Sequence, residues 1–138
     1  MKTRLLRASI AILAVLSASQ LIAHHGTGIS YDLQNDPLVL RGTVTEFRWQ
    51  NPHVSIFMDV QDETGNVVNW SIECTSIIGF AQDGYNRNAL KTGQEITALV
   101  YPSKVRGVPA AVLAHVTLPD GTEILHYQSD TPGGRGIN

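Results

Sequence analysis

Two histidine-containing segments carry the side chains best suited to chemistry in this sequence. His24-His25 follows an apolar N-terminal stretch, and His53 ends an Asn-Pro-His turn at residues 51–53. Copper, nickel and zinc all accept imidazole nitrogens as ligands, and a carboxylate such as Glu73 extends the set. The sequence therefore predicts a transition-metal site whose ligands are His24, His25, His53 and Glu73.

Glu73 is expected beside His53 because of the pattern of the two strands that carry them. Apolar residues occupy every second position at 54–60 and again at 68–74, and a glycine-containing turn joins these stretches. If both apolar faces share one core, Glu73 must lie opposite His53 or Ser55 on the other face. Directly opposed residues have Cβ atoms ~5 Å apart. The imidazole and the carboxylate can then bind one ion or each other.

The N-terminal residue of the exported chain decides which metal is favoured. Cleavage before His24 gives this residue a free α-amine beside its own ring, and His25 or His53 adds another nitrogen. A planar nitrogen set favours Cu(II) or Ni(II), whereas a tetrahedral set that includes Glu73 favours Zn(II). Copper is the favoured expectation. Because the amine titrates near ~8 and imidazole near ~6.5, binding weakens below about pH 6 as protons compete.

The N-terminus itself has the features of a secretory signal peptide. Three basic residues precede an apolar run at residues 8–18, which is shorter than the ~20 apolar residues of a membrane-spanning helix. Cleavage after Ala23 is favoured, and cleavage after Ser19 is the alternative. We therefore expect a periplasmic or secreted bacterial protein with no membrane anchor after cleavage.

Composition narrows the class of protein further. The chain has 138 residues and a net charge of −2, which fits one domain without the basic surface that nucleic acid requires. Cys74 is the single cysteine, so an internal disulfide and a multi-cysteine metal site are both excluded. Cys74 falls on an apolar strand face and is expected in the core.

The remaining pattern predicts a mainly β fold. A short helix capped by Thr75 or Ser76 is expected between the third and fourth strands, and Gly42 with a slip in apolar phase predicts a bulge in the first strand. This order indicates a small OB-like β-barrel of five to six antiparallel strands, with a small β-sandwich as the alternative. The expected segments are a signal peptide at 1–23, an extended N-terminal arm at 24–37, the barrel at 38–128 and a disordered tail at 129–138.

Each candidate ligand also has a purely structural interpretation. His53 can hydrogen-bond a turn carbonyl, and Glu73 can pair with Arg41 or Arg48. His115 and His126 are expected at the surface and not as ligands.

Two further function classes compete with metal binding. One is a non-catalytic module of the cell envelope that binds a small ligand or an envelope protein without metal, through Trp49, Asn51, Phe57 and Tyr101. The other is an enzyme, which is not favoured because no nucleophile–base motif, phosphate-binding loop or pair of catalytic carboxylates is found.

Several short motifs together resemble a known group of proteins. They are His24-His25, Tyr31-Asp32, Gly42-Thr43-Val44, Trp49-x-Asn51-Pro52-His53, Trp70-x-x-Glu73, Leu90-Lys91-x-Gly93 and Asp120-Gly121. This combination resembles domain-of-unknown-function family 6152, a group of small exported bacterial proteins, from His24 to about Leu125. Members often begin with His-His-Ser-Phe, whereas Gly26-Thr27 follows the histidines here. The resemblance implies export and a small β-rich domain, and it implies no activity.

Overall fold

The computed structural model describes residues 26–126. The expected signal peptide, His24, His25 and the expected tail at 129–138 therefore lie outside the described residues. The chain forms two units that divide after Ser30, and the second unit begins at Tyr31. In the described part of the first unit, α2 (Gly26–Ser30) is a five-residue helix where an extended arm was expected. Within residues 26–126, no helix has the length and apolar character needed to cross a membrane.

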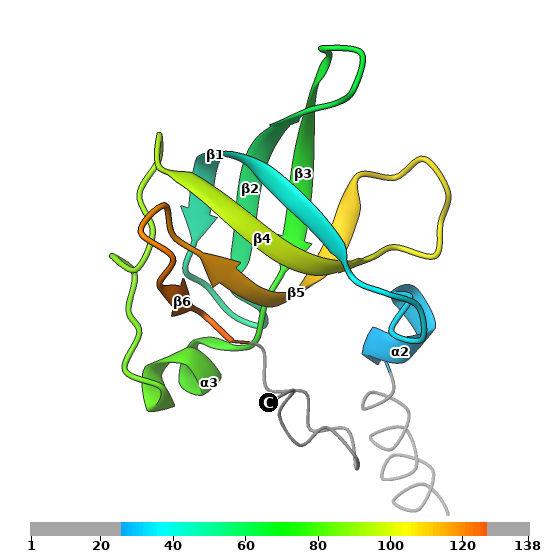
Figure 1. Ribbon diagram of the computed structural model, residues 1–138. Coiled ribbons are helices and arrows are strands. Elements are labelled where there is room, and N and C mark those ends of the chain that lie inside the picture. The colour runs from blue at the N-terminus through cyan, green and yellow to red at the C-terminus, as the bar shows by residue number, and fades with distance from the viewer. Residues whose placement is uncertain (1–25, 127–138) are drawn as a thin grey trace, which may run out of the picture. The chain divides into compact units, whose positions relative to one another are not determined.

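The second unit is a closed β-barrel (Figure 1). Five strands follow the order β3-β2-β1-β4-β5, and a further pairing of β3 with β5 closes the sheet, while a short sixth strand extends from β5. The elements are β1 (Leu38–Arg48), β2 (Ser55–Gln61), β3 (Val67–Glu73), α3 (Ile77–Gln82), β4 (Glu95–Pro102), β5 (Ala110–Thr117) and β6 (Glu123–Ile124). The predicted barrel, with its helix between the third and fourth strands, is confirmed. The expectation of purely antiparallel pairing is wrong, because β3 and β5 run parallel where they close the barrel.

The first strand coils around the barrel by the two devices that the sequence indicates. Its register against β2 shifts between Val44 and Glu46, which is the predicted bulge. Gly42 lets β1 and β2 approach closely, because a Cβ at this position would overlap the carbonyl oxygen of Asp59. With this curvature β1 pairs with β2 along one part and with β4 along the other.

The barrel interior holds the core, and α3 contributes to it from the link between β3 and β4. Phe80 of α3 is fully buried, together with Ile56, Ile72 and Cys74 from the β2–β3 hairpin. Ser76 caps α3 by accepting a hydrogen bond from the amide of Gly79 at 3.2 Å, and this confirms one of the two predicted caps. Cys74 is a core residue, as expected.

The fifth strand departs from the simple alternation of its sequence. Its register against β4 shifts between Leu99 and Val100, so that Ala114 has no partner there. Leu113 and Val116 therefore both enter the core, and His115 lies on the outer face between them in sequence. Strict alternation along this strand predicts that Val112, Ala114 and Val116 share one face, and the irregularity makes this prediction wrong.

Candidate functional site

His53 stands immediately before β2, and its ring is held by the backbone of the neighbouring strand. Val54, which follows it, is fully buried and exchanges hydrogen bonds of 2.9 and 2.8 Å with Thr75 and Cys74. The Nδ1 atom of His53 lies 3.2 Å from the carbonyl oxygen of Cys74. Because a carbonyl oxygen only accepts, Nδ1 carries the hydrogen, and the neutral ring keeps its lone pair on Nε2. The side chain remains 48% exposed.

Glu73 lies beside this ring, as the strand pattern predicts. The register pairs Glu73 with Ser55, one of the two pairings that the sequence allows. Its Oε1 is 3.7 Å from His53 Nδ1, and its Oε2 accepts a 3.0 Å hydrogen bond from the Tyr31 hydroxyl. The carboxylate thus lies on the Nδ1 side of the imidazole, where it is a second acceptor near the hydrogen on Nδ1. Arg48 pairs instead with Glu46, at 2.7 and 2.8 Å.

Tyr31 attaches the beginning of the second unit to this corner of the barrel. Its backbone forms an antiparallel bridge with Ser103, just after β4, while its hydroxyl reaches Glu73 on β3. The strand between these two points is β5, whose Val112 pairs with Glu73 on one side and Tyr101 on the other. Val112 is 1% exposed although it does not belong to the core cluster. Tyr31 therefore crosses β5 on the outer face of the barrel at the level of Glu73.

The four residues of the alternative binding surface have separate surroundings. The ring of Trp49 stacks on Phe80 at 6.2 Å, so this tryptophan packs against the core. Asn51 is exposed in the turn, and the Arg48 guanidinium covers the Phe57 ring at 4.4 Å from its centroid. Phe57 pairs with Glu46 near one end of β1, whereas Tyr101 follows the residue that pairs with Leu38 at the other end. Tyr101 is not brought to the other three.

Three residues that the sequence analysis did not select as ligands come together at β5 and β6. His115 of β5, Glu123 of β6 and His126 beyond β6 each offer a donor atom, and these atoms lie within 4.8 Å of one another. The distance from His115 Nε2 to Glu123 Oε1 is 3.5 Å, and the two imidazole centroids are 5.5 Å apart. The signal for part of this group was the Asp120-Gly121 turn, which brings Glu123 back along β5.

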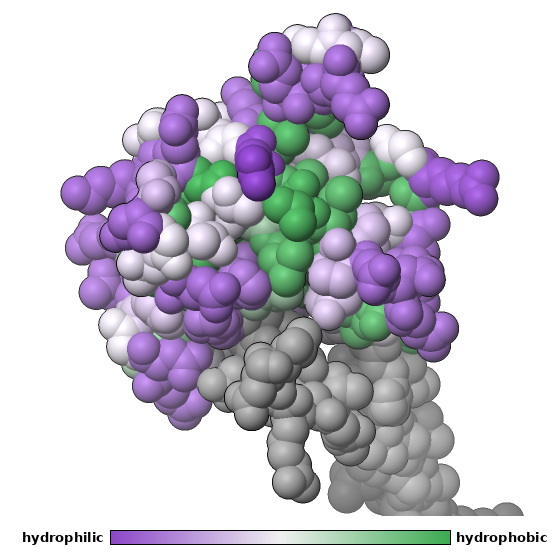
Figure 2. Space-filling view, in the orientation of Figure 1, coloured by the Kyte–Doolittle hydropathy of each residue, from purple (hydrophilic) through white to green (hydrophobic). Residues whose placement is uncertain are grey.

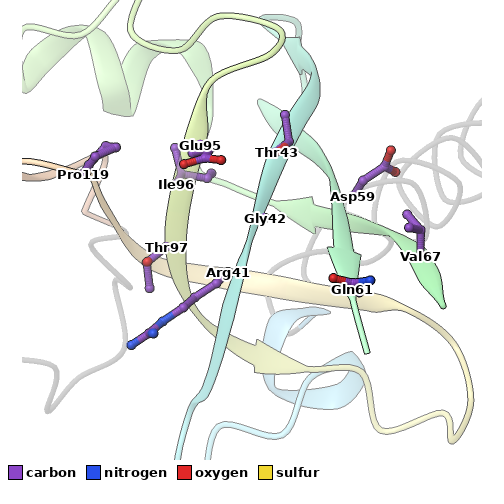
Figure 3. Close-up of a pocket in the computed structure, with 10 residues that line it drawn as sticks. All are labelled: Arg41, Gly42, Thr43, Asp59, Gln61, Val67, Glu95, Ile96, Thr97 and Pro119. Carbon is purple, nitrogen blue, oxygen red and sulfur yellow. The ribbon is translucent and has the colours of Figure 1, made fainter. Parts of the chain in front are cut away.

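A groove on the outer surface of β1, β2 and β4 has no comparable set of converging donors (Figure 3). Gly42 lies at its middle, and Arg41, Asp59 and Glu95 contribute charges of both signs from three different strands. Figure 2 shows hydrophobic side chains gathered in the middle of one face of the molecule, with hydrophilic side chains around them. The groove itself is lined by charged, polar and apolar residues, as is ordinary for the outer surface of a barrel.

The Cys74 thiol is not available as a ligand. The residue is fully buried, and this desolvation, with a smaller contribution from the charge of Glu73, raises the pKa of the thiol far above its ordinary value. The group that Cys74 offers to His53 is its backbone carbonyl. Thiolate chemistry is thereby excluded from the His53 site at neutral pH.

These features define a class of protein: a small closed β-barrel with an oriented imidazole at the entry to its β2–β3 hairpin. The chain matches the family of unknown function DUF6152 over residues 11–109, and it belongs to this family. The resemblance seen in the motifs is thus confirmed. The matched stretch includes His53 and Glu73 and ends before His115. No curated protein and no solved structure matches the chain.

Proposed function

We propose that this protein is exported to the bacterial periplasm and binds a transition metal, copper being favoured, through His53 and the histidines of its mature N-terminus. The observation that carries the proposal is the hydrogen bond between His53 Nδ1 and the Cys74 carbonyl oxygen, at 3.2 Å. It assigns the hydrogen to Nδ1, so that the lone pair of Nε2 on this half-exposed ring is available to an ion.

A metal-binding histidine is usually held in this way. Its second ring nitrogen donates to a carbonyl or a carboxylate, which fixes the tautomer and the ring orientation. His53 has both kinds of acceptor near Nδ1, the Cys74 carbonyl in hydrogen-bond contact and the Glu73 carboxylate at 3.7 Å. Tyr31 in turn donates to Glu73 and orients the carboxylate. This arrangement favours Glu73 as a partner of the imidazole, and a direct bond from Glu73 to the ion stays a prediction.

One imidazole is too few for a transition metal, so the further donors must come from elsewhere. His24 and His25 precede Tyr31 by seven and six residues, a length of chain that reaches at most about 25 Å when extended. Tyr31 is itself hydrogen-bonded to Glu73, beside His53. The covalent chain therefore allows the N-terminal histidines to reach the site. Cleavage after Ala23 adds the α-amine of His24 to the same set.

The donor types decide among the metals. Nitrogen donors in a planar set favour Cu(II) over Zn(II), and nickel is the nearest competitor. Inclusion of the Glu73 carboxylate in a tetrahedral set favours zinc instead. Copper bound through nitrogens would make this protein a carrier or sensor of the metal in the envelope, and the site residues perform no bond-breaking chemistry in such a role.

The test begins with the N-terminus of the protein purified from the periplasm, read by sequencing, followed by titration with Cu(II) and Zn(II). A chain that begins at His24 is expected to bind Cu(II) with submicromolar affinity. His53→Ala is expected to weaken binding by at least about tenfold, because a fixed ligand contributes no less than the groups that orient it. Gln50→Ala, in the same exposed turn, is the matched control and leaves the affinity unchanged.

Three results would contradict the proposal. Export that leaves the chain uncleaved or cut at another position removes the amine ligand. Binding of both ions no tighter than micromolar, by a chain that begins at His24, rules out the metal function. Unchanged affinity in His53→Ala confines any binding to the N-terminal histidines and overturns the assignment of the barrel ligand.

A further inference from the structure

The group formed by His115, Glu123 and His126 lies on the outer side of β5 and β6 and shares no residue with the His53 site. All three donor atoms fall within 4.8 Å of one another, and His115 Nε2 is 3.5 Å from Glu123 Oε1. The His115 side chain is 23% exposed and that of Glu123 is 54% exposed, so solvent and ions reach the group.

Backbone geometry brings these three side chains together. The β5–β6 register pairs Thr117 with Glu123, so Glu123 projects beside His115 on the same face, two residues away along β5. His126 comes three residues after Glu123, and in a continuous strand such residues face opposite sides. Leu125 breaks the alternation: its φ is 54° and its side chain is fully buried. The buried leucine thus holds the chain in the turn that returns His126 to the side of Glu123.

We propose that His115, Glu123 and His126 form a second metal site, with zinc as its ion. Two histidines and one glutamate are a three-ligand set typical of zinc sites that keep a fourth position for water. Zinc–ligand bonds of 2.0–2.2 Å require donor atoms about 3.3–3.5 Å apart in a tetrahedron. One pair of donors already has this spacing, and the others need to approach by at most about 1.5 Å, which rotation of exposed side chains supplies.

The ion would fasten the segment that follows β6 to the barrel. Strand β6 has only two residues, and its pairing with β5 ends at Val116 and Ile124. A zinc ion shared by β5, β6 and the residue after Leu125 adds a cross-link where the hydrogen-bonded ladder stops. The site acts on the conformation of this segment and does not depend on the His53 site or on the proposed copper function.

Zinc titration of the purified protein tests the site, with the ring signals of the histidines followed by NMR. The signals of His115 and His126 are expected to shift together and to saturate with one equivalent of Zn²⁺. Glu123→Gln and His126→Gln are expected to weaken this binding by at least about tenfold. Glu63→Gln removes an exposed carboxylate of the β2–β3 loop as the matched control and leaves it unchanged.

The outcomes separate this site from the His53 site. In His53→Ala the coupled shifts of His115 and His126 persist with the same affinity, whatever happens to copper binding. Rings that do not respond up to millimolar zinc overturn the proposal, and so does wild-type zinc affinity in both Glu123→Gln and His126→Gln. A spectrum that keeps its dispersion in each variant shows that any loss comes from the ligand and not from unfolding.

Discussion

The two histidine groups of this molecule are built in opposite ways. His53 is one imidazole with a fixed tautomer, held by the Cys74 carbonyl and flanked by Glu73. His115 belongs to three donors that already face one another, and its polar contact is with a side chain, the Glu123 carboxylate. The first group thus has orientation without enough donors among the described residues, and the second has enough donors without a backbone acceptor to orient them.

Each group therefore lacks something different for binding an ion. A pre-oriented ligand gains affinity when a partner brings further donors, so the proposed metal site at His53 would depend on the N-terminal histidines. The His115 group needs only the ion, but its donors lose rotational freedom when they bind, which costs part of the interaction energy. The family match covers the first group and ends at residue 109, before the second. Both groups border the link between β3 and α3, where His53 contacts Cys74 and His126 lines a small pocket with Thr75.

The largest effect is expected from Leu125→Ala, which attacks the support of the second group alone. Truncation of a fully buried leucine lowers the free energy of unfolding by about 2–5 kcal/mol. It also releases the turn that positions His126, so zinc binding weakens while the His53 site keeps its affinity. Urea unfolding and zinc titration measure the two effects. Val105→Ala, at a 63% exposed valine, changes the stability by less than about 0.5 kcal/mol. Unchanged zinc affinity in Leu125→Ala would show that Leu125 does not position His126 for zinc binding.

Zinc should stabilise the folded protein through the second group. An ion that binds the folded chain and not the unfolded one adds about 2.7 kcal/mol to the free energy of unfolding at a concentration of 100 Kd. Thermal unfolding with and without Zn²⁺ measures this increment. It should vanish in His115→Ala and persist in His53→Ala. If the increment vanished in His53→Ala and persisted in His115→Ala, zinc would stabilise the protein through the first group and not through the second.

A smaller effect is expected from Tyr31→Phe, which weakens the orientation of the first group. The change removes the 3.0 Å hydrogen bond to Glu73 and lowers the free energy of unfolding by about 1 kcal/mol. With Glu73 no longer fixed, copper affinity should fall about tenfold, and zinc affinity at His115 should not change. Tyr101→Phe is the control, since no hydrogen bond of the Tyr101 hydroxyl is found among residues 26–126. Equal copper affinity in both variants would leave Tyr31 with a structural role only.

Local signals in the sequence predict the first group better than the second. The alternating stretches on either side of the hairpin fix the parity of pairing, and this places Glu73 beside His53 on the outer face. Gly42 and the phase slip likewise predict the bulge in β1. These signals are periodicity and glycine, which act within a few residues. They suffice for the barrel strands and for one imidazole–carboxylate contact.

The position of the second group depends on structural features that no short sequence pattern predicts. The irregularity at Ala114 contains neither glycine nor proline, and it decides which side chains of β5 enter the core. The left-handed conformation of Leu125 is rare for such a residue and is held by burial in the folded barrel. The parallel β3–β5 pairing is also a result of closure. Tertiary packing therefore determines which side chains His126 meets, while its predicted position at the surface is confirmed.

The smallest effect concerns Cys74, whose carbonyl and not its thiol serves the His53 site. Burial raises the pKa of this thiol above its ordinary value of 9.0, so the folded protein keeps the proton that the unfolded chain releases. The stability contributed by the protonated thiol is therefore complete below about pH 9 and is lost as the pH rises further. Cys74→Ala should show a shallower decline of the free energy of unfolding between pH 8 and about pH 10, although its stability at neutral pH is lower. Tyrosine and lysine titrate in both proteins, so the difference between the two slopes isolates the thiol.

Copper affinity should stay within about twofold in Cys74→Ala, because the backbone carbonyl that orients His53 is retained. A large loss of copper binding with an unchanged fold would instead make the sulfur a ligand and overturn the assignment of Nε2 as the donor of this corner.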